Sequence, residues 1–212
     1  MSRVPYQKTD EAVAKITSKL HREFRHNRVA LFDEMNIVSV KRHINKLYTT
    51  VYKTVKQEFL NVAKEIEQEI YDEVIALGFD GDLRDIDEAW IEEFFNAYNP
   101  VTKYVFSNEI DRKKSRLFES LVASRLTKEQ SYKTAENLLK RQINQYAIDL
   151  EDAVTLMVFK DVGVEKVKWV AEHDHRTCGD CKELDGEVFD LDKAPDKLHY
   201  QCRCTLQPVK SE

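Results

Sequence analysis

The residues best suited to chemistry lie together near the end of the chain. All four cysteines fall between positions 178 and 204, as Cys178-x-x-Cys181 and Cys202-x-Cys204, and His199 stands three positions before Cys202. A Cys-x-x-Cys pair closes a tight turn that directs two thiolates at one ion, and a second pair from a distant loop completes a tetrahedron. We therefore expect a structural zinc site of Cys178, Cys181 and Cys202, with either Cys204 or His199 as the fourth ligand.

Two other states of these thiols stay open. Disulfides are disfavoured in a reducing cytosol, although a particle later exposed outside the cell would permit them. Free or redox-active thiols are the third state. A redox Cys-x-x-Cys sits in a βαβ unit, however, and the sequence shows no such unit. Zinc is the interpretation that best fits the spacing and the compartment.

The same stretch holds the one cluster that suggests an enzyme. His173, Asp174 and His175 are consecutive and resemble the ligand set of a metal-dependent nuclease. The chain has no zinc-deaminase pattern, no His-Glu-x-x-His protease motif and no glycine-rich phosphate loop. We expect a protein that is not an enzyme, and we keep the nuclease, or another enzyme built on these three residues, as the alternative.

The elements that must position these residues are mostly helices. Five glycines and four prolines in 212 residues are too few for an all-β sandwich or a doubly wound fold. Apolar residues recur every 3.6 positions or so from Ile37 to Leu77, which predicts a long helix stopped by Gly78. Other helices are predicted to open near residue 10, to span 85–98 and 105–122, and to run from a Thr127/Gln130 capping box to about 159, with a candidate break at Asp149.

The character of the sequence changes after Gly163. Residues 166–174, 187–191 and 205–209 are short, rich in β-branched or aromatic side chains, and read as strands. We predict a mainly α fold with two parts. Residues 1–163 form an elongated helical bundle with long helices, and residues 164–212 form a small C-terminal Cys-rich β module stabilised by zinc.

Charge is unevenly distributed along the chain. Residues 1–56 carry twelve Lys and Arg against five Asp and Glu, whereas residues 57–100 carry two against thirteen. Such basic residues are most often a solvated helix face, and they can also pair with the acidic stretch. A weaker interpretation is contact with double-stranded DNA or an acidic protein. The residues concerned are Arg22, Arg25, Arg28, Lys41, Arg42 and Lys46.

Beyond the cysteines, residues 169–209 follow one recognisable order. This order resembles the C-terminal signature of phage minor head proteins, the head morphogenesis family that includes the Mu F-like proteins. The chain departs from that signature at Lys197, Leu198 and Tyr200, where proline is common or usual. The matching residues are Trp169, Asp174 to Cys181, Leu184 to Gly186, Phe189, Pro195, His199, Cys202 to Cys204, Pro208 and Val209.

The resemblance implies a function that composition and periodicity do not. It implies a minor capsid protein of a tailed-phage virion, which associates with the portal and other head proteins and takes part in head assembly and in viral DNA ejection. It also implies a helical region ahead of the Cys-rich tail. No run of about 18 apolar residues and no signal-peptide pattern occurs, so we expect synthesis in the host cytoplasm and no membrane span.

Overall fold

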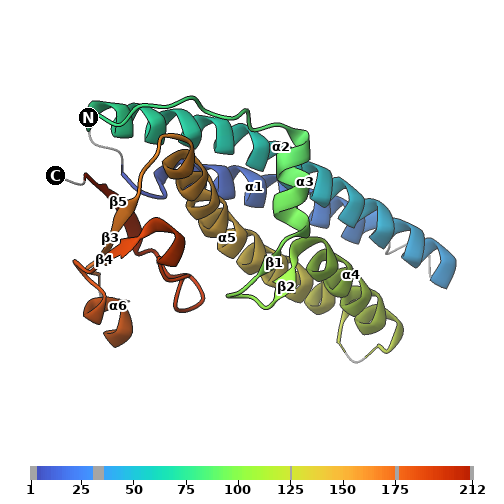
Figure 1. Ribbon diagram of the computed structural model, residues 1–212. Coiled ribbons are helices and arrows are strands. Elements are labelled where there is room, and N and C mark those ends of the chain that lie inside the picture. The colour runs from blue at the N-terminus through green and yellow to red at the C-terminus, as the bar shows by residue number, and fades with distance from the viewer. Residues whose placement is uncertain (1–3, 31–35, 125, 175–176, 211–212) are drawn as a thin grey trace.

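The computed structural model describes residues 4–30, 36–124, 126–174 and 177–210. It confirms a mainly α fold, in which three long helices run along an elongated bundle (Figure 1). These helices are α1 (Gln7–Ala30), α2 (Ile37–Ala76) and α5 (Lys128–Asp161), and each packs against the other two. The shorter helices are α3 (Glu88–Asn96), α4 (Phe106–Val122) and α6 (Gly179–Glu183).

The long helix predicted from the 3.6-residue period is α2. Its apolar seam is buried from Ile44 to Val74, whereas Ile37 and Leu77, at the two ends of the pattern, are exposed. Gly78 adopts a φ of 84° and donates its N–H to the carbonyl of Ile75 at 2.8 Å. This left-handed conformation suits glycine, so the predicted stop of the helix is confirmed.

The predicted break at Asp149 is wrong, because α5 is one continuous helix. Asp149 accepts hydrogen bonds from the side chains of Gln145, at 2.7 Å, and Asn99, at 2.5 Å, and so does not compete for backbone donors. The Thr127/Gln130 capping box at the start of α5 is confirmed. α5 is therefore the central helix of the bundle, and α1, α2 and α4 all pack against it.

The helix expected over residues 85–98 is shorter than predicted. It begins only after Asp87, whose carboxylate caps the N–H of Trp90 at 2.9 Å, and residues 79–86 run as extended chain. An unpredicted hairpin of β1 (Tyr98–Asn99) and β2 (Tyr104–Val105) follows. Its Asn99 is the residue that reaches Asp149, which fixes the hairpin against α5.

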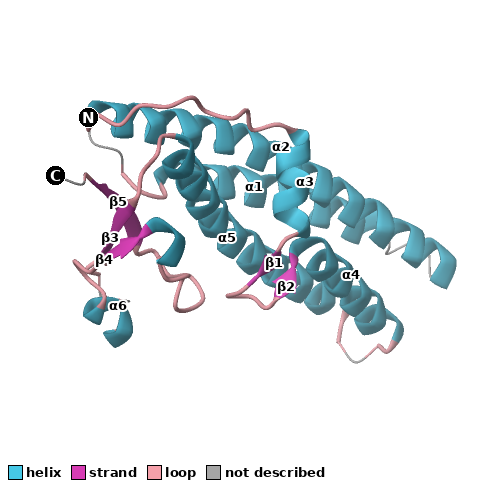
Figure 2. Cartoon of the chain, in the orientation of Figure 1, coloured by secondary structure: helices cyan, strands magenta, loops and turns pink. Residues whose placement is uncertain are grey.

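The C-terminal module is a three-stranded antiparallel sheet with the order β4-β3-β5. Figure 2 shows it beside the helical bundle, with α6 beyond it. On the central strand, Val167 joins the main hydrophobic core whereas Trp169 packs against the cysteines. The core thus continues past Gly163, and the division of the chain there stays a prediction. The strands are β3 (Lys166–Val170), β4 (Val188–Asp190) and β5 (Thr205–Val209), and a 3-10 turn spans Leu191–Lys193.

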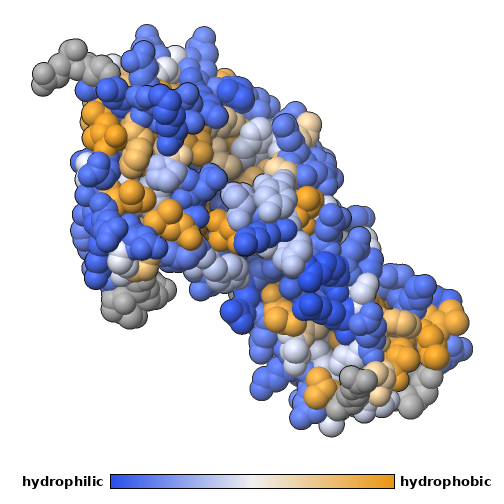
Figure 3. All heavy atoms as spheres, turned by 60° about the horizontal axis from the view of Figure 1, so that its bottom comes forward, coloured by the Kyte–Doolittle hydropathy of each residue, from blue (hydrophilic) through white to orange (hydrophobic). Residues whose placement is uncertain are grey.

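Most of the surface in Figure 3 is hydrophilic, and apolar side chains gather at the lower right end of that view. Among the described residues, no helix is both long and apolar enough to cross a membrane. The exposed apolar side chains near the α1–α2 turn and the end of α4 are Val29, Ile37, Val38, Val122 and Leu126.

Candidate metal centre

The first cysteine pair is placed by helix α6. Cys178 is the N-cap of this helix, and its sulfur accepts the backbone N–H of Cys181 at 3.4 Å. Cys178 is half-buried, and Cys181 is fully buried. The Cys-x-x-Cys turn predicted from the sequence therefore forms, and it directs both sulfurs toward the loop that precedes β5.

That loop supplies the remaining donors. The backbone N–H of Cys202 bonds to the carbonyl of His199 at 3.2 Å, which closes a tight turn. The Cys181 sulfur lies 3.5 Å from Nε2 of His199 and 3.7 Å from the sulfur of Cys202. A tetrahedral zinc with Zn–S near 2.3 Å and Zn–N near 2.0 Å has edges of about 3.8 Å and about 3.5 Å. The two separations match those edges.

The five candidate ligands fall into two sets, and Cys181 belongs to both. Cys178, Cys181 and His199 form one set whose ligand atoms lie within 4.8 Å of one another, and Cys181, Cys202 and Cys204 form a second. The other ring nitrogen of His199, Nδ1, lies 3.0 Å from the carbonyl oxygen of Tyr200. That contact favours the tautomer in which Nε2 is free to bind a metal.

Burial makes this cluster unfavourable for ionised thiols unless a cation is present. Burial, together with hydrogen bonds from the Cys181 thiol to the neighbouring sulfurs, raises the pKa of Cys181, and burial raises the pKa of Cys204. A divalent cation reverses this preference, since its charge stabilises thiolates directly. The donor set of soft sulfur and imidazole nitrogen is the one that Zn²⁺ prefers.

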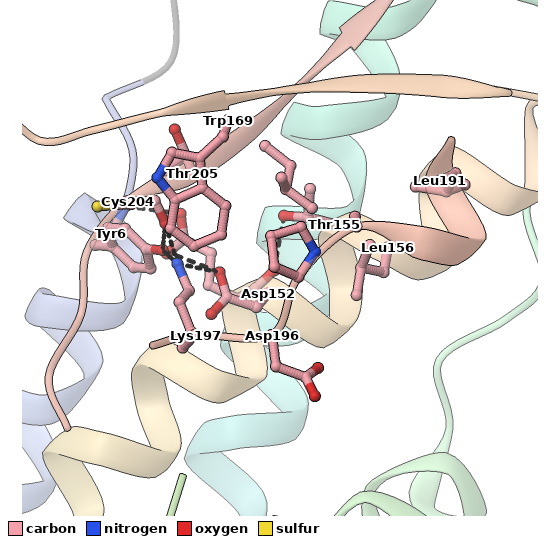
Figure 4. Close-up of a pocket in the computed structure, with 14 residues that line it drawn as sticks. Tyr6, Asp152, Thr155, Leu156, Trp169, Leu191, Asp196, Lys197, Cys204 and Thr205 are labelled. Carbon is pink, nitrogen blue, oxygen red and sulfur yellow. Dashed lines mark hydrogen bonds and ion pairs between the residues drawn. The ribbon is translucent and has the colours of Figure 1, made fainter. Parts of the chain in front are cut away.

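The cluster is tied to the helical bundle by a network of Tyr6, Asp152, Lys197 and Cys204, here named the Tyr6 network (Figure 4). The Tyr6 hydroxyl donates to the carboxylate of Asp152 at 2.9 Å and lies 3.1 Å from the carbonyl oxygen of Cys204. The Lys197 ammonium donates to the Tyr6 hydroxyl at 2.7 Å, to Asp152 at 3.1 Å and to the Cys204 carbonyl. A small cavity of about 90 Å³ adjoins the network.

Three further bonds fix the same loop to the bundle. The backbone N–H of Gln201 donates to Gln145 at 2.6 Å, and the Tyr200 hydroxyl donates to the carbonyl of Arg141 at 2.6 Å. Arg203 makes a two-pronged ion pair with Asp10 of α1. Loop 197–203 therefore has its path set by the bundle as well as by the cysteines.

Sequence reasoning missed this attachment. Lys197 and Tyr200, where the chain departs from the family signature, both contact the bundle, and that departure was the one available signal. Tyr6 has a positive φ of 62° and is fully buried, yet nothing in its sequence context marks it.

The residues of the enzyme alternative do not form a metal site among the described residues. Nε2 of His173 lies 3.1 Å from the carboxylate of Asp185, and Asp174 closes a turn with Thr177. His175 lies outside the described residues. His173 and Asp174 therefore make their described contacts inside the C-terminal module.

The basic first quarter divides into two groups. Lys8, Lys15 and Lys19 pair with carboxylates of α2, with Lys15 and Lys19 on either oxygen of Glu58 at 2.6 and 2.5 Å. These three lysines are not among the six basic residues singled out in the sequence. Of the six residues predicted to contact nucleic acid, Arg28 pairs with Glu129 at 2.9 Å. The other five have no carboxylate within ion-pair distance among the described residues: Arg22, Arg25, Lys41, Arg42 and Lys46.

These six residues do not form a single face. Arg25 and Arg28 line a groove between α1 and α5, and Arg22 and Arg25 line an adjoining hollow. Lys41, Arg42 and Lys46 line neither. On α2, Lys41 and Lys46 are five positions apart and so point about 140° away from each other around the helix.

Comparison with known proteins gives one match. Residues 118–207 match the family described as phage Mu protein F like protein. The matched part runs from the last turn of α4 through α5 and the cysteine centre to β5. No curated protein matches the chain, and no solved structure does. The resemblance carried by the tail is therefore confirmed and extends further forward than the tail itself: over residues 118–207 this chain is similar to the phage Mu F-like proteins, a family of phage head proteins.

Proposed function

We propose that the protein is a structural minor head protein of a tailed phage, which is made in the host cytoplasm, is carried in the virion and acts through contacts with the portal. The observation that carries this proposal is the family match over residues 118–207, because it covers both the helix that organises the bundle and the complete set of candidate metal ligands. The exposed apolar end of the bundle offers a surface for a protein partner.

The proposed role of the cysteine centre is structural. One zinc ion would be held by Cys178, Cys181 and Cys202 with His199 or Cys204, and a set of four protein ligands leaves no position open for substrate. The module's own buried cluster is small, so such a site would supply much of its stability. Metal analysis of purified protein should find about one zinc per chain, and freely reactive thiols with no metal would contradict this.

A second proposed contact is with DNA, through the basic residues of the first quarter. Arg22, Arg25, Lys41, Arg42 and Lys46 are exposed, and Arg28 is half-buried. Cations without carboxylate partners are available to replace the counterions of a phosphate backbone. This contact would serve DNA delivery, as the family resemblance implies.

The function is tested by co-expressing the protein with the portal protein of the same phage. A tag on the portal should recover this protein, and a tag on the major capsid protein alone should not. A particle assembled without this protein should form a head of reduced infectivity. Recovery that does not depend on the portal, or virions that lack the protein and infect normally, would contradict the proposal.

A further inference from the structure

The groove between α1 and α5 combines a surplus of cations with buried donors that have no acceptor. It has a volume of about 490 Å³, and its charged walls come from two helices far apart in the sequence. Four of its residues are cations and two are carboxylates, which leaves two positive charges in excess before the histidine is counted. The charged residues are Arg25, Arg28, Lys133 and Lys140, with Glu129 and Glu136, and His21 lies beside them.

Both carboxylates of the groove are already used by its own cations. Glu129 accepts from Arg28 at 2.9 Å, and Glu136 accepts from Lys140 at 2.6 Å and lies 2.9 Å from His21. Burial alone would raise the pKa of Glu136, but hydrogen bonds from Lys140 and His21 hold it below its usual value. Glu129 thus orients Arg28, and Glu136 orients Lys140 and His21. Arg25 and Lys133, by contrast, are exposed and have no carboxylate partner among the described residues.

Two buried donors at the groove have no acceptor among the described residues. Tyr132 lines the groove, is 3% exposed, and its hydroxyl has no hydrogen-bond partner among the described residues. The Nε of Arg28 is buried and unpartnered in the same way. Arg28 is half-buried, so its guanidinium can reach a ligand that supplies oxygen acceptors, whereas the Tyr132 hydroxyl is covered.

The basic surface continues out of the groove along α1. An adjoining hollow shares His21 and Arg25 with it and is completed by Arg22, His26 and Val29, with no acidic side chain. Arg22 and Arg28 are six positions apart, about 9 Å along the helix. They also point about 120° apart, with Arg25 between them, so the basic surface wraps around one side of α1.

We infer that this α1–α5 groove is the place where the protein binds the sugar-phosphate backbone of double-stranded DNA, without reading its sequence. The inference rests on the DNA contact proposed above and assigns it to Arg22, Arg25, Arg28, Lys133 and Lys140, leaving Lys41, Arg42 and Lys46 of α2 outside the contact. The two aromatic rings of the groove, Phe24 and Tyr132, are buried, so unpaired bases find no stacking platform. Val29 is the one exposed apolar residue along the surface, which is too little to anchor a peptide.

The test measures binding of a labelled 30-base-pair duplex over a series of salt concentrations. Arg25→Glu/Lys133→Glu reverses two charges in the groove, and Lys41→Glu/Arg42→Glu reverses two on α2 as the matched control. All four positions are exposed, and glutamate is a good helix former, so both variants should keep their helical signal. The groove variant should lower the slope of log affinity against log salt by about 2, and the control should leave the slope unchanged.

Other results would overturn the assignment in distinguishable ways. Equal losses in both variants would mean that only the overall field matters, and a loss confined to the α2 variant would move the contact there. If the groove variant binds duplex normally but no longer co-purifies with the portal, the groove binds an acidic protein surface instead. If wild-type protein fails to bind duplex even at low salt, the DNA contact is wrong, whereas the proposed head function is judged separately by recovery with the portal.

Discussion

The bundle and the Cys-rich module bury very different amounts of apolar surface. Among the described residues, the main core cluster has 35 buried members, whereas the cluster around the cysteines has five, three of which are cysteines. A core of the first size supports a fold through burial alone. The second is too small for that, so we expect the module to depend on metal binding by its thiols, on β3 as a shared strand and on the Tyr6 network.

This difference in core size indicates which substitutions should unfold the whole chain and which should unfold only the Cys-rich module. A defect in the seam of α2 is transmitted to α1, α4 and α5, because all three pack against it. We expect a defect at the cysteines to stay within the neighbouring loop 197–203, whose attachments to the bundle through Tyr200, Gln201 and Arg203 are polar. Four substitutions test this difference between the bundle and the module, and they are given from the largest expected effect to the smallest.

The first change is Ile44→Asp in the buried seam of α2. Ile44 is 1% exposed, so the variant places an unpaired charge in the core. The free energy of unfolding should fall by several kcal/mol, which is enough to unfold the bundle. Circular dichroism during thermal unfolding measures this. Ile37→Asp, on the same helix at a position 59% exposed, is the matched control and should melt like wild type. If Ile44→Asp melts normally and merely loses a partner, the seam is an interface.

The second change is Cys181→Ser at the centre of the candidate metal site. Both sets of candidate ligands include Cys181, so its loss should remove the zinc and open residues 177–204 locally. Metal content together with hydrogen exchange should show the zinc lost and these residues unprotected, while the helical signal persists. Lys182→Ser, the exposed neighbour on α6, is the control. Global unfolding would refute the idea that the module fails locally.

The third change is Tyr6→Phe in the Tyr6 network. It removes one hydroxyl that donates to Asp152 and accepts from Lys197, and should lower the free energy of unfolding by about 1–2 kcal/mol. Urea unfolding measures the loss, and Tyr98→Phe, at a position 64% exposed, should show none. An effect as small as that of the control would mean that the network adds no stability to the module's attachment.

The fourth change is Asp149→Asn, at a carboxyl group in α5 whose pKa is raised. Burial raises the pKa of Asp149 from 3.8 to about 7, against opposing hydrogen bonds from Gln145 and Asn99. The folded chain therefore binds more protons than the unfolded chain between about pH 4 and pH 7, and the free energy of unfolding falls as pH rises through that window. Since the side chain is only half-buried, we expect about 1 kcal/mol between pH 5 and pH 7.

Asp149→Asn should flatten this pH dependence in urea unfolding at pH 5, 6 and 7. Asp111→Asn, on the exposed face of α4, is the control and should keep the wild-type slope. If the slope survives in Asp149→Asn, another group carries it.

The sequence predicted those parts of the structure that depend on local chemistry. The period of α2, the left-handed glycine Gly78 and the capping box of α5 each act within a few residues, and all were found as expected. The Cys178–Cys181 turn was predictable for the same reason, because one turn of α6 sets its spacing. The contact that Asp149 makes in α5 was not, since its donor Asn99 lies 50 positions away.

The attachment of the centre was out of reach for a related reason. Tyr6 meets Asp152 across 146 positions, and a pattern in one sequence carries no sign of such a pairing. The groove is similar, because Lys133 and Lys140 have no charge run of their own and become part of a basic surface only when α5 lies beside α1.

The Tyr6 network also sets an order of events during synthesis. Tyr6 and Cys204 are 198 positions apart, so at about 5–20 residues per second the ribosome adds the second roughly 10–40 s after the first. Helices form in microseconds, and the bundle up to α5 has all of its partners long before the last cysteine emerges. Tyr6, Glu151 and Asp152 are then already in place, and the tail closes onto a finished surface.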